Sequence, residues 1–357
     1  MYRSLGKNRG DKMDKKKLKI LLMITPIVTV LAIVLCIVFA KISDTKNDGK
    51  KNSEGFELDT DSVNSFEICK GPDCVFVSDN SLCVCKNGVL MMYDKNGDSK
   101  EFDTELNIVK GIGEGGSLYF IDDKGGLYGF DTESEKTELL LSGVSDVTHG
   151  GAVYGAVTTD GKLYLWGKDV GKYVGAAVKG TVARPTEYKS DVHWKALSFK
   201  TQHLLALDDN GNVYESERYE DSDTSLKKAE GLKDIVQIHC GCNNIAISKD
   251  GHISVWNGIY GTDVMPVDTD APKKIEDKLN DVKPTHFEFG GKYDIAYNDS
   301  GAYLWGVSGL SRENKSTDSK GTPTLVKSFG DYDSIYCGGN VIYKKNGTKV
   351  TAYCLHY

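Results

Sequence analysis

The sequence lacks the short signatures by which common enzymes are recognised. It contains no Gly-x-Ser-x-Gly elbow, no His-Glu-x-x-His zinc motif and no phosphate-binding loop. Residues 167–173 approach the phosphate-loop pattern, but the spacing is short and Tyr173 stands where Ser or Thr would bind magnesium. We therefore expect no enzyme activity, and no cofactor is predicted.

Metal-ligating patterns are also missing. Cys240 and Cys242 follow His239, but no second pair of Cys or His lies at zinc-finger spacing. Residues 94–98 are rich in Asp and Asn, as calcium loops are, but the loop lacks a glutamate at its twelfth position. We interpret that segment as a hairpin turn, and we predict no metal site.

Proline is scarce, and the body of the chain has no basic stripe. There are 7 prolines against 39 glycines and 19 tyrosines, a composition typical of short strands joined by glycine-containing turns. The net charge is −7, but residues 1–19 carry +6, so the remaining residues carry −13. A body this acidic argues against nucleic acid as the partner.

The one long hydrophobic run lies near the amino terminus. Residues 20–40 contain no charged residue and, as a helix, would span roughly 30 Å, the thickness of a bilayer core. The basic residues 1–19 predict a single-pass signal anchor in the cell membrane, with a cytoplasmic amino terminus and an extracytoplasmic carboxyl-terminal domain. The competing interpretation is a cleaved signal peptide, because residues 38–40 resemble a cleavage site. Residues 41–63 are polar and predict a flexible linker.

Residues 64–357 contain a repeated phrase, in which a turn glycine precedes an apolar strand. Clear copies read Asp-Gly-Lys-Leu-Tyr-Leu-Trp-Gly at 160–167 and Ser-Gly-Ala-Tyr-Leu-Trp-Gly at 300–306. The turn glycines are Gly88, Gly125, Gly161, Gly211, Gly251, Gly301 and Gly347. Small residues precede the inner strands, and no helical period separates the copies. Because a two-stranded unit is unstable alone, the repetition predicts an all-β propeller of about seven blades, with six or eight still open.

The repeats resemble those of the regulator of chromosome condensation family, which join a Cys-Gly corner, an Asp-Gly turn and a Trp. Cys240, Asp250 and Trp256 follow this pattern, and His203 occupies the histidine position of the preceding copy. The resemblance implies a seven-bladed β-propeller over about residues 66–357. Members of the family serve as exchange factors, inhibitors and scaffolds, so the resemblance implies a fold without naming a partner.

The two ends of the propeller are predicted to meet. Residues 65–69 are expected to add a strand to the last blade, which ends at 349–357, because an open ring would leave sheet edges exposed. Cys69 and Cys74, or one of them with Cys354, are the candidate disulfide cysteines at this closure. Disulfides have to be considered because the predicted compartment is oxidising.

Side chains at fixed places in the repeat are expected to pack between blades. Trp166, Trp256 and Trp305 recur at one place and are interpreted as packing residues. Cys240 and Cys337 occupy the Cys-Gly corner, where we expect free thiols. Aromatic residues outside the repeat pattern are the candidate interaction residues, and they are Tyr173, Tyr219 and Tyr260.

The combined prediction is a membrane-anchored, extracytoplasmic β-propeller of a bacterial cell that acts as a protein-binding or envelope-binding module. Its partner is expected to be a protein or a cell-envelope component, recognised by loops on one face. Two alternatives stay open. One is a secreted inhibitor of an extracellular enzyme, and the other is an envelope enzyme that acts on a glycan or a small molecule.

Overall fold

The structure is a computed structural model that describes residues 55–355, apart from 115, 169, 171–179, 201–202, 217–225, 258–270, 292 and 307–320. The basic tail 1–19, the predicted transmembrane helix 20–40 and residues 41–54 of the predicted linker lie outside the described residues. Within the described ranges, no helix is long and apolar enough to cross a membrane.

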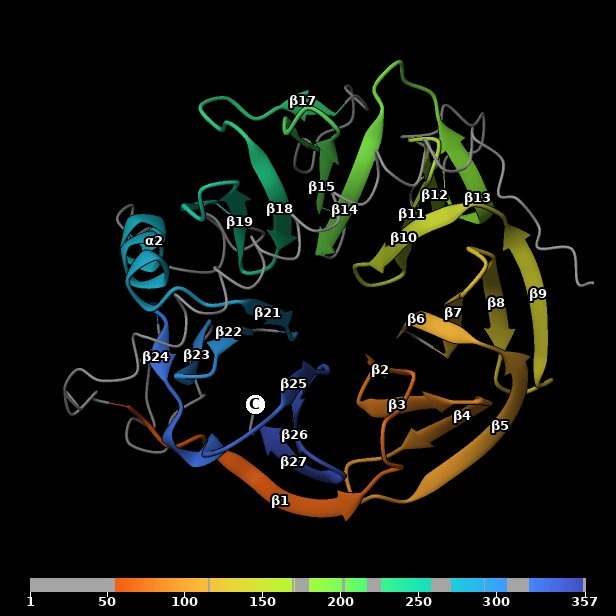
Figure 1. Ribbon diagram of the computed structural model, residues 1–357, viewed down its shortest axis with the longest axis vertical. Coiled ribbons are helices and arrows are strands. Elements are labelled where there is room, and N and C mark those ends of the chain that lie inside the picture. The colour runs from red at the N-terminus through yellow and green to blue at the C-terminus, as the bar shows by residue number, and fades with distance from the viewer. Residues whose placement is uncertain are drawn as a thin grey trace, which may run out of the picture. The chain divides into compact units, whose positions relative to one another are not determined.

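The described strands form seven antiparallel units that follow one another along the chain and make a ring in Figure 1. In each unit, the first of the strands that are consecutive in the chain lies nearest the centre of the ring. This arrangement is a β-propeller, and each unit is one blade. The all-β propeller prediction is confirmed, and the described residues contain seven blades.

Blades 1 to 3 each contain four strands. Blade 1 contains β2 (Cys74–Ser78), β3 (Ser81–Lys86), β4 (Gly88–Tyr93) and β5 (Ser99–Leu106). Blade 2 contains β6 (Ile108–Glu114), β7 (Ser117–Asp122), β8 (Leu127–Asp131) and β9 (Lys136–Leu141). Blade 3 contains β10 (Val144–His149), β11 (Val153–Thr158), β12 (Leu163–Gly167) and β13 (Val182–Tyr188). A parallel pairing of Ser78 with Gly113 joins blades 1 and 2.

Blades 4 to 7 differ in how they are completed at the outer edge. Blade 4 contains β14 (Trp194–Lys200), β15 (His203–Asp208), β16 (Val213–Glu215) and β17 (Lys227–Lys228). Blade 5 contains β18 (Ile235–Cys240), β19 (Asn243–Ser248) and β20 (Ile253–Asn257), followed by α2 (Ala271–Val282). Blade 6 contains β21 (His286–Phe289), β22 (Tyr293–Asn298), β23 (Gly301–Gly306) and β24 (Thr324–Leu325). After the 3₁₀ helix η1 (Lys327–Phe329), blade 7 contains β25 (Ser334–Cys337), β26 (Val341–Asn346), β27 (Lys349–Leu355) and the amino-terminal strand β1 (Thr60–Glu67).

The seven turn glycines identified in the sequence occupy the second hairpin of the seven blades. Each has a positive φ, for example 84° at Gly88 and 85° at Gly251. A non-glycine residue is disfavoured there, which explains why the repeat places glycine at this point. The residue three positions earlier often closes the turn with its side chain. The carboxylate of Asp208, for example, accepts hydrogen bonds from the N–H groups of Asn210 and Asn212.

The hydrophobic core is divided among the junctions between neighbouring blades. Seven clusters of buried apolar side chains lie at the seven junctions of the described ring. Trp166 and Trp305 are each 1% exposed within such clusters, as the packing prediction requires. Trp256 is partly buried against the cluster between blades 4 and 5. Each blade therefore depends on both of its neighbours for burial of its apolar faces.

Strand β1 closes the ring as predicted, but it spans Thr60–Glu67 rather than residues 65–69. It pairs antiparallel with β27, and Phe66 stands opposite Val350 in the register. The segment before β1 also belongs to the propeller, because Phe56 and Leu58 are 2% and 3% exposed in the cluster between blades 6 and 7. The boundary that the sequence placed after residue 63 therefore lies nearer the amino terminus.

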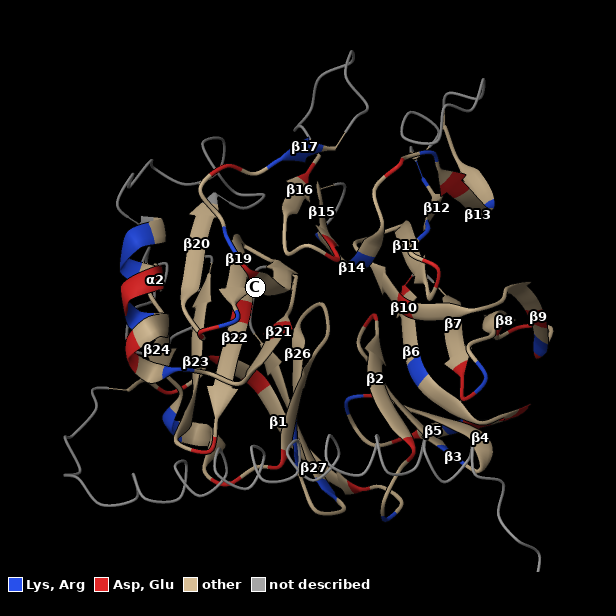
Figure 2. Cartoon of the chain, turned by 45° about the horizontal axis from the view of Figure 1, so that its top comes forward, with Lys and Arg blue, Asp and Glu red and all other residues tan. Residues whose placement is uncertain are grey.

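Helix α2 was not predicted, and the expectation that no helical period separates the repeats is wrong at this point. Ile275 and Leu279 lie one turn apart and are buried against blade 5, while lysines and acidic residues follow the exposed side of the helix (Figure 2). Lys283 ends the helix with a φ of 49°, and Pro284 follows it. A left-handed residue followed by proline is a recognised helix stop.

Candidate functional site

The predicted interaction residues Tyr173, Tyr219 and Tyr260 lie outside the described residues. Their places in the chain are nevertheless related. They belong to segments 171–179, 217–225 and 258–270, which follow the third strands β12, β16 and β20 of three successive blades. The first and third strands of an antiparallel blade run in the same direction, so β12, β16 and β20 end on the face where the innermost strands also end. We call this face the axial face.

The predicted disulfide cysteines are free thiols in the structure. Cys354 is 3% exposed and stands opposite Ser62 of β1 and Val341 of β26. Cys69 lies just beyond β1, while Cys74 begins β2 and faces Cys85 of β3. The expected pairing among Cys69, Cys74 and Cys354 is therefore not found, because strand register gives Cys74 a different thiol as its nearest cysteine partner.

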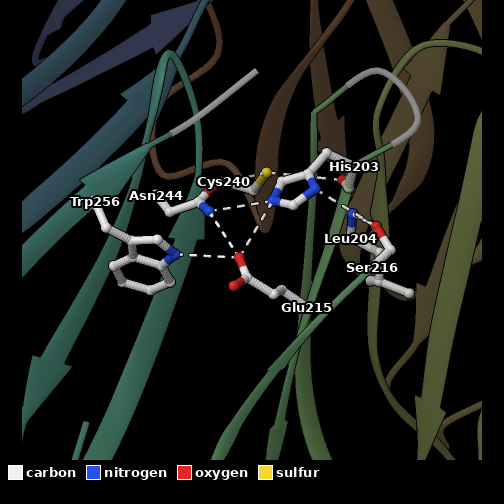
Figure 3. A network of polar contacts seen from close by, with 7 residues as sticks. All are labelled: His203, Leu204, Glu215, Ser216, Cys240, Asn244 and Trp256. Atoms are coloured by element: carbon white, nitrogen blue, oxygen red, sulfur yellow. Dashed lines mark hydrogen bonds and ion pairs between the residues drawn. The ribbon is translucent and has the colours of Figure 1, made fainter. Parts of the chain in front are cut away.

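A network of polar side chains joins blades 4 and 5 near the end of the inner strands (Figure 3). The Nε2 atom of His203 lies 3.1 Å from the Asn244 side-chain nitrogen and 3.9 Å from a Glu215 carboxylate oxygen. The Trp256 indole N–H donates to the same Glu215 oxygen at 3.1 Å. His203 and Asn244 are 6% and 0% exposed, so this part of the network is buried, where unpaired polar groups would be costly.

Cys240 also takes part in this network. Its Sγ atom lies 3.7 Å from the backbone carbonyl oxygen of His203 and 3.7 Å from Asn244 Oδ1. These contacts hold blades 4 and 5 together, and Cys240 is buried and not disulfide-bonded, as predicted.

The inner strands of blades 2, 3 and 4 each end in a polar or charged residue at the axial face. These residues are Glu114 of β6, His149 of β10 and Lys200 of β14. His149 Nδ1 lies 3.1 Å from a Glu114 oxygen, and this hydrogen bond holds the pKa of Glu114 below its ordinary value. The Lys200 ammonium donates to the backbone carbonyl of Gly290, which belongs to blade 6 rather than to the adjacent blade 5. Lys200 therefore reaches past one blade at the centre of the ring.

Two acidic side chains of blade 6 complete this group. Asp294 is 0% exposed and accepts a hydrogen bond from the Cys242 N–H at 2.7 Å. Burial raises the pKa of Asp294 to about 6, while the charge of Lys200 opposes the rise. Burial also raises the pKa of Glu288 to about 8, so at neutral pH this side chain is mainly protonated and can donate a hydrogen bond. We call Glu114, His149, Lys200, Glu288 and Asp294 the axial cluster.

The axial cluster can offer a ligand a cation and hydrogen-bonding groups of both kinds. Within the described residues, no group of three or more His, Cys, Asp or Glu side chains is placed to hold a metal ion. Closely spaced charges in a partly desolvated setting interact more strongly than they would in water. The contacts of His149 with Glu114 and of Lys200 with Gly290 hold these side chains in fixed positions at this end of the ring.

No family model and no curated protein matches this chain. Solved structures do match. Human WBSCR16 superposes with a TM-score of 0.61 at 14% sequence identity, covering 82% of this chain and 89% of that one. Prp20p from Saccharomyces cerevisiae gives 0.59 at 14% identity, covering 79% and 82%. A structure of Kap60 bound to yeast RCC1 (Prp20) gives 0.57 at 14% identity, covering 79% and 80%.

The chain has an RCC1-like β-propeller fold. This agrees with the resemblance of the repeats, in which the Cys-Gly corner, the Asp-Gly turn and the Trp occupy corresponding places in the blades. At 14% identity the likeness concerns the fold alone.

Sequence reasoning did not find the axial cluster. Its members come from five strands, and the cluster spans Glu114 to Asp294 in the chain. One available signal was the position of Glu114, His149 and Lys200, each of which directly precedes a small-residue or polar corner between first and second strands. The contact between Lys200 and Gly290 had no sequence signal, because it depends on the curvature of the closed ring.

Proposed function

We propose that the chain is a membrane-anchored β-propeller that binds a protein or a cell-envelope component outside the cytoplasm through its axial face. The anchor is the apolar segment 20–40, and the basic residues 1–19 favour a cytoplasmic amino terminus. The propeller is the binding domain. This is the function that the polar groups at the axial face support best.

The observation that carries the proposal is the convergence of recognition groups on one face. The inner strands of three successive blades place Glu114, His149 and Lys200 at this end of the ring. The third strands of blades 3, 4 and 5 end on the same face, and the candidate tyrosines follow them in the chain. Charged groups combined with aromatic side chains are typical of protein-binding surfaces.

The fold likeness supports a protein as the class of partner. Prp20p has binding properties to Gsp1p and histones, and yeast RCC1 (Prp20) is bound by Kap60. A closed propeller suits this role because its rigid sheets hold surface groups in fixed positions, so little conformational freedom is lost on binding. The acidic body of this chain points to a partner with complementary positive charge.

The experiment begins with the location of the propeller. The full-length chain, with a carboxyl-terminal tag, is expressed in its source cell, and intact cells are treated with protease. We expect the tag to be removed from intact cells, while a cytoplasmic marker protein is not cleaved. A tag that is cleaved only after lysis would reject the extracytoplasmic location, without bearing on binding.

Binding is then tested by capture of proteins from the detergent-solubilised envelope on the tagged full-length chain. The axial-face variant combines Lys200→Gln with Tyr173→Ala and Tyr260→Ala. The matched control combines Lys162→Gln with Lys249→Gln at exposed turns of the opposite face. We expect a saturable partner whose recovery falls at least about tenfold in the axial-face variant and stays unchanged in the control. Equal recovery by both variants, or no saturable partner, contradicts the proposed face.

A further inference from the structure

Two cysteines of blade 1 stand directly opposite each other on neighbouring strands. Cys74 of β2 is paired with Cys85 of β3 in the antiparallel register. Residues paired in this way have Cα atoms roughly 4.5–5.5 Å apart, within the range of about 4.4–6.8 Å that a disulfide requires. Each thiol also shifts the pKa of the other, which places the two side chains close together.

The surroundings of the two sulfur atoms differ in a way that assigns them different roles. The Cys74 sulfur lies near the Cys85 thiol, the Gly111 backbone and the Lys110 ammonium. These groups favour the thiolate and lower the pKa of Cys74, although burial opposes them. Cys85 is 3% exposed, and its pKa is raised. Cys74 is thus the partly exposed nucleophile, and Cys85 is a buried thiol at its side.

We propose that Cys74 and Cys85 form a thiol–disulfide exchange site whose oxidant is a disulfide of a protein or of a small thiol compound. The Cys74 thiolate attacks one sulfur of the external disulfide, which forms a mixed disulfide and releases one external thiolate. Cys85 gives its proton to that thiolate and attacks the Cys74 sulfur. The product is the Cys74–Cys85 disulfide, and two electrons have passed to the oxidant. The second external thiolate leaves at this point and takes from solvent the proton that Cys74 released on ionising, so the oxidant ends as two thiols.

The third cysteine of this region has no comparable partner. Cys83 is 0% exposed and stands opposite Phe76, so no cysteine faces it across β2 and β3. Burial raises the pKa of Cys83, which disfavours the reactive thiolate. The pair Cys74–Cys85 is therefore the one that strand register and chemistry select, and its oxidation would link the first two strands of blade 1.

The inference is independent of the proposed binding function and is tested on the purified full-length chain in detergent. The reduced protein is treated with iodoacetamide, and labelling is followed cysteine by cysteine. A second sample is oxidised with glutathione disulfide, blocked with N-ethylmaleimide and digested without reduction. Cleavage on the amino side of Asp73 and Asp79 separates Cys74 from Cys83 and Cys85, so the bridge joins two peptides.

We expect Cys74 to be labelled at least about tenfold faster than Cys83 or Cys85, and the oxidised sample to contain a bridge between Cys74 and Cys85. The Cys85→Ser variant should accumulate glutathione on Cys74, because no second thiol displaces it, whereas Cys83→Ala should form the bridge as the wild type does. Oxidation should raise the melting temperature by about 5 °C.

Three results would overturn the inference. One is equal labelling of Cys74 and Cys83 in the folded wild type, which needs no variant. The second is a bridge that joins Cys74 to Cys69, Cys83 or Cys354. The third is a folded Cys85→Ser protein that does not retain glutathione at Cys74.

Discussion

In the described residues, blades 5 and 7 each have three strands from their own stretch of the chain, and the outer edge of each is covered in a different way. In blade 7 the amino-terminal strand β1 pairs with β27 and supplies backbone hydrogen bonds. In blade 5 the helix α2 covers β20 with side chains in place of a strand. The Asn280 amide donates to the Ile253 carbonyl at 2.7 Å and accepts from the Ile253 N–H at 3.0 Å.

The comparison teaches that an exposed strand edge needs hydrogen-bonding groups at the right places and does not require a strand. The primary amide of asparagine carries the same donor and acceptor as a peptide group. Asn280 can therefore form hydrogen bonds with both the N–H and the carbonyl of Ile253. One turn earlier, the Glu276 carboxylate accepts from the Val255 N–H at 3.0 Å. Both devices protect an edge that would otherwise pair with another chain.

The largest effect on stability is expected from removing strand β1. A chain that begins at residue 68 lacks β1 and the buried residues Phe56 and Leu58. We expect it to aggregate or to lose cooperative unfolding, because the ring loses its closure and an outer edge is exposed. Soluble yield, circular dichroism and thermal melting are compared with those of a chain that begins at residue 55. Equal melting of the two chains would show that β1 is dispensable.

A smaller loss of stability is expected from truncating one buried side chain in the segment before β1. Phe56→Ala should lower the free energy of unfolding by about 3–5 kcal/mol, because it leaves a cavity between blades 6 and 7. Glu57→Ala is the matched control, since the neighbouring side chain is exposed. Urea unfolding of both variants gives the difference. Similar losses in the two variants would mean that the segment is held by its backbone alone.

The covering of the β20 edge by helix α2 is expected to depend on the Asn280 amide. Asn280→Ala leaves the N–H and carbonyl of Ile253 without these partners and should lower the free energy of unfolding by about 2 kcal/mol. Asp277→Ala, on the exposed side of α2, should change it by less than about 0.5 kcal/mol. Hydrogen exchange at Ile253 should accelerate in the first variant only. Unchanged exchange there would mean that α2 covers β20 by apolar contact alone.

The smallest effect on stability is expected from two titratable side chains, His239 of blade 5 and Glu288 of blade 6. On β18 of blade 5, burial lowers the pKa of His239 from 6.5 to about 4, so His239 favours folding less as pH falls from 6.5 towards 4. On β21 of blade 6, burial raises the pKa of Glu288 from 4.5 to about 8. Since ionised Glu288 is disfavoured in the folded state, stability is lost as pH rises from 4.5 to 8.

Melting temperatures from pH 4 to pH 9 test these two signs. Glu288→Gln should flatten the alkaline side of the profile by a few degrees and leave the acid side unchanged. His239→Gln should do the reverse. A Glu288→Gln protein that melts with the wild-type profile would mean that the carboxyl group is solvated in the folded chain.

Much of the propeller could be predicted from the sequence because the repeat carries local requirements. A positive φ at Gly88 or Gly251 favours glycine wherever the turn occurs, so the turn is visible in the chain itself. The buried positions of Trp166 and Trp305 follow from their recurrence at one place in the repeat. The closing strand was found by the same reasoning, since a ring with one strand missing requires another segment to supply it.

The candidate site was predicted less well, because its contacts join distant parts of the chain. Nothing near Lys200 indicates that it reaches Gly290, and nothing near Cys74 indicates that Cys85 rather than Cys69 or Cys354 is its partner. The pairing of two cysteines depends on register, and a shift of one residue would send one thiol to the other face. Helix α2 was missed because only Ile275 and Leu279 mark its buried side, and the repeat led us to expect a strand.

By itself the sequence determined the apolar segment 20–40, the number of turn glycines and the alternation that makes each repeat a set of strands. These are local properties, decided by φ, by side-chain volume and by hydrophobic length. Only the tertiary structure decided which device completes each blade, which thiols face each other and which charges meet at the axial face. Such contacts arise from closing the ring, where strands far apart in the chain are brought to fixed distances that no local pattern records.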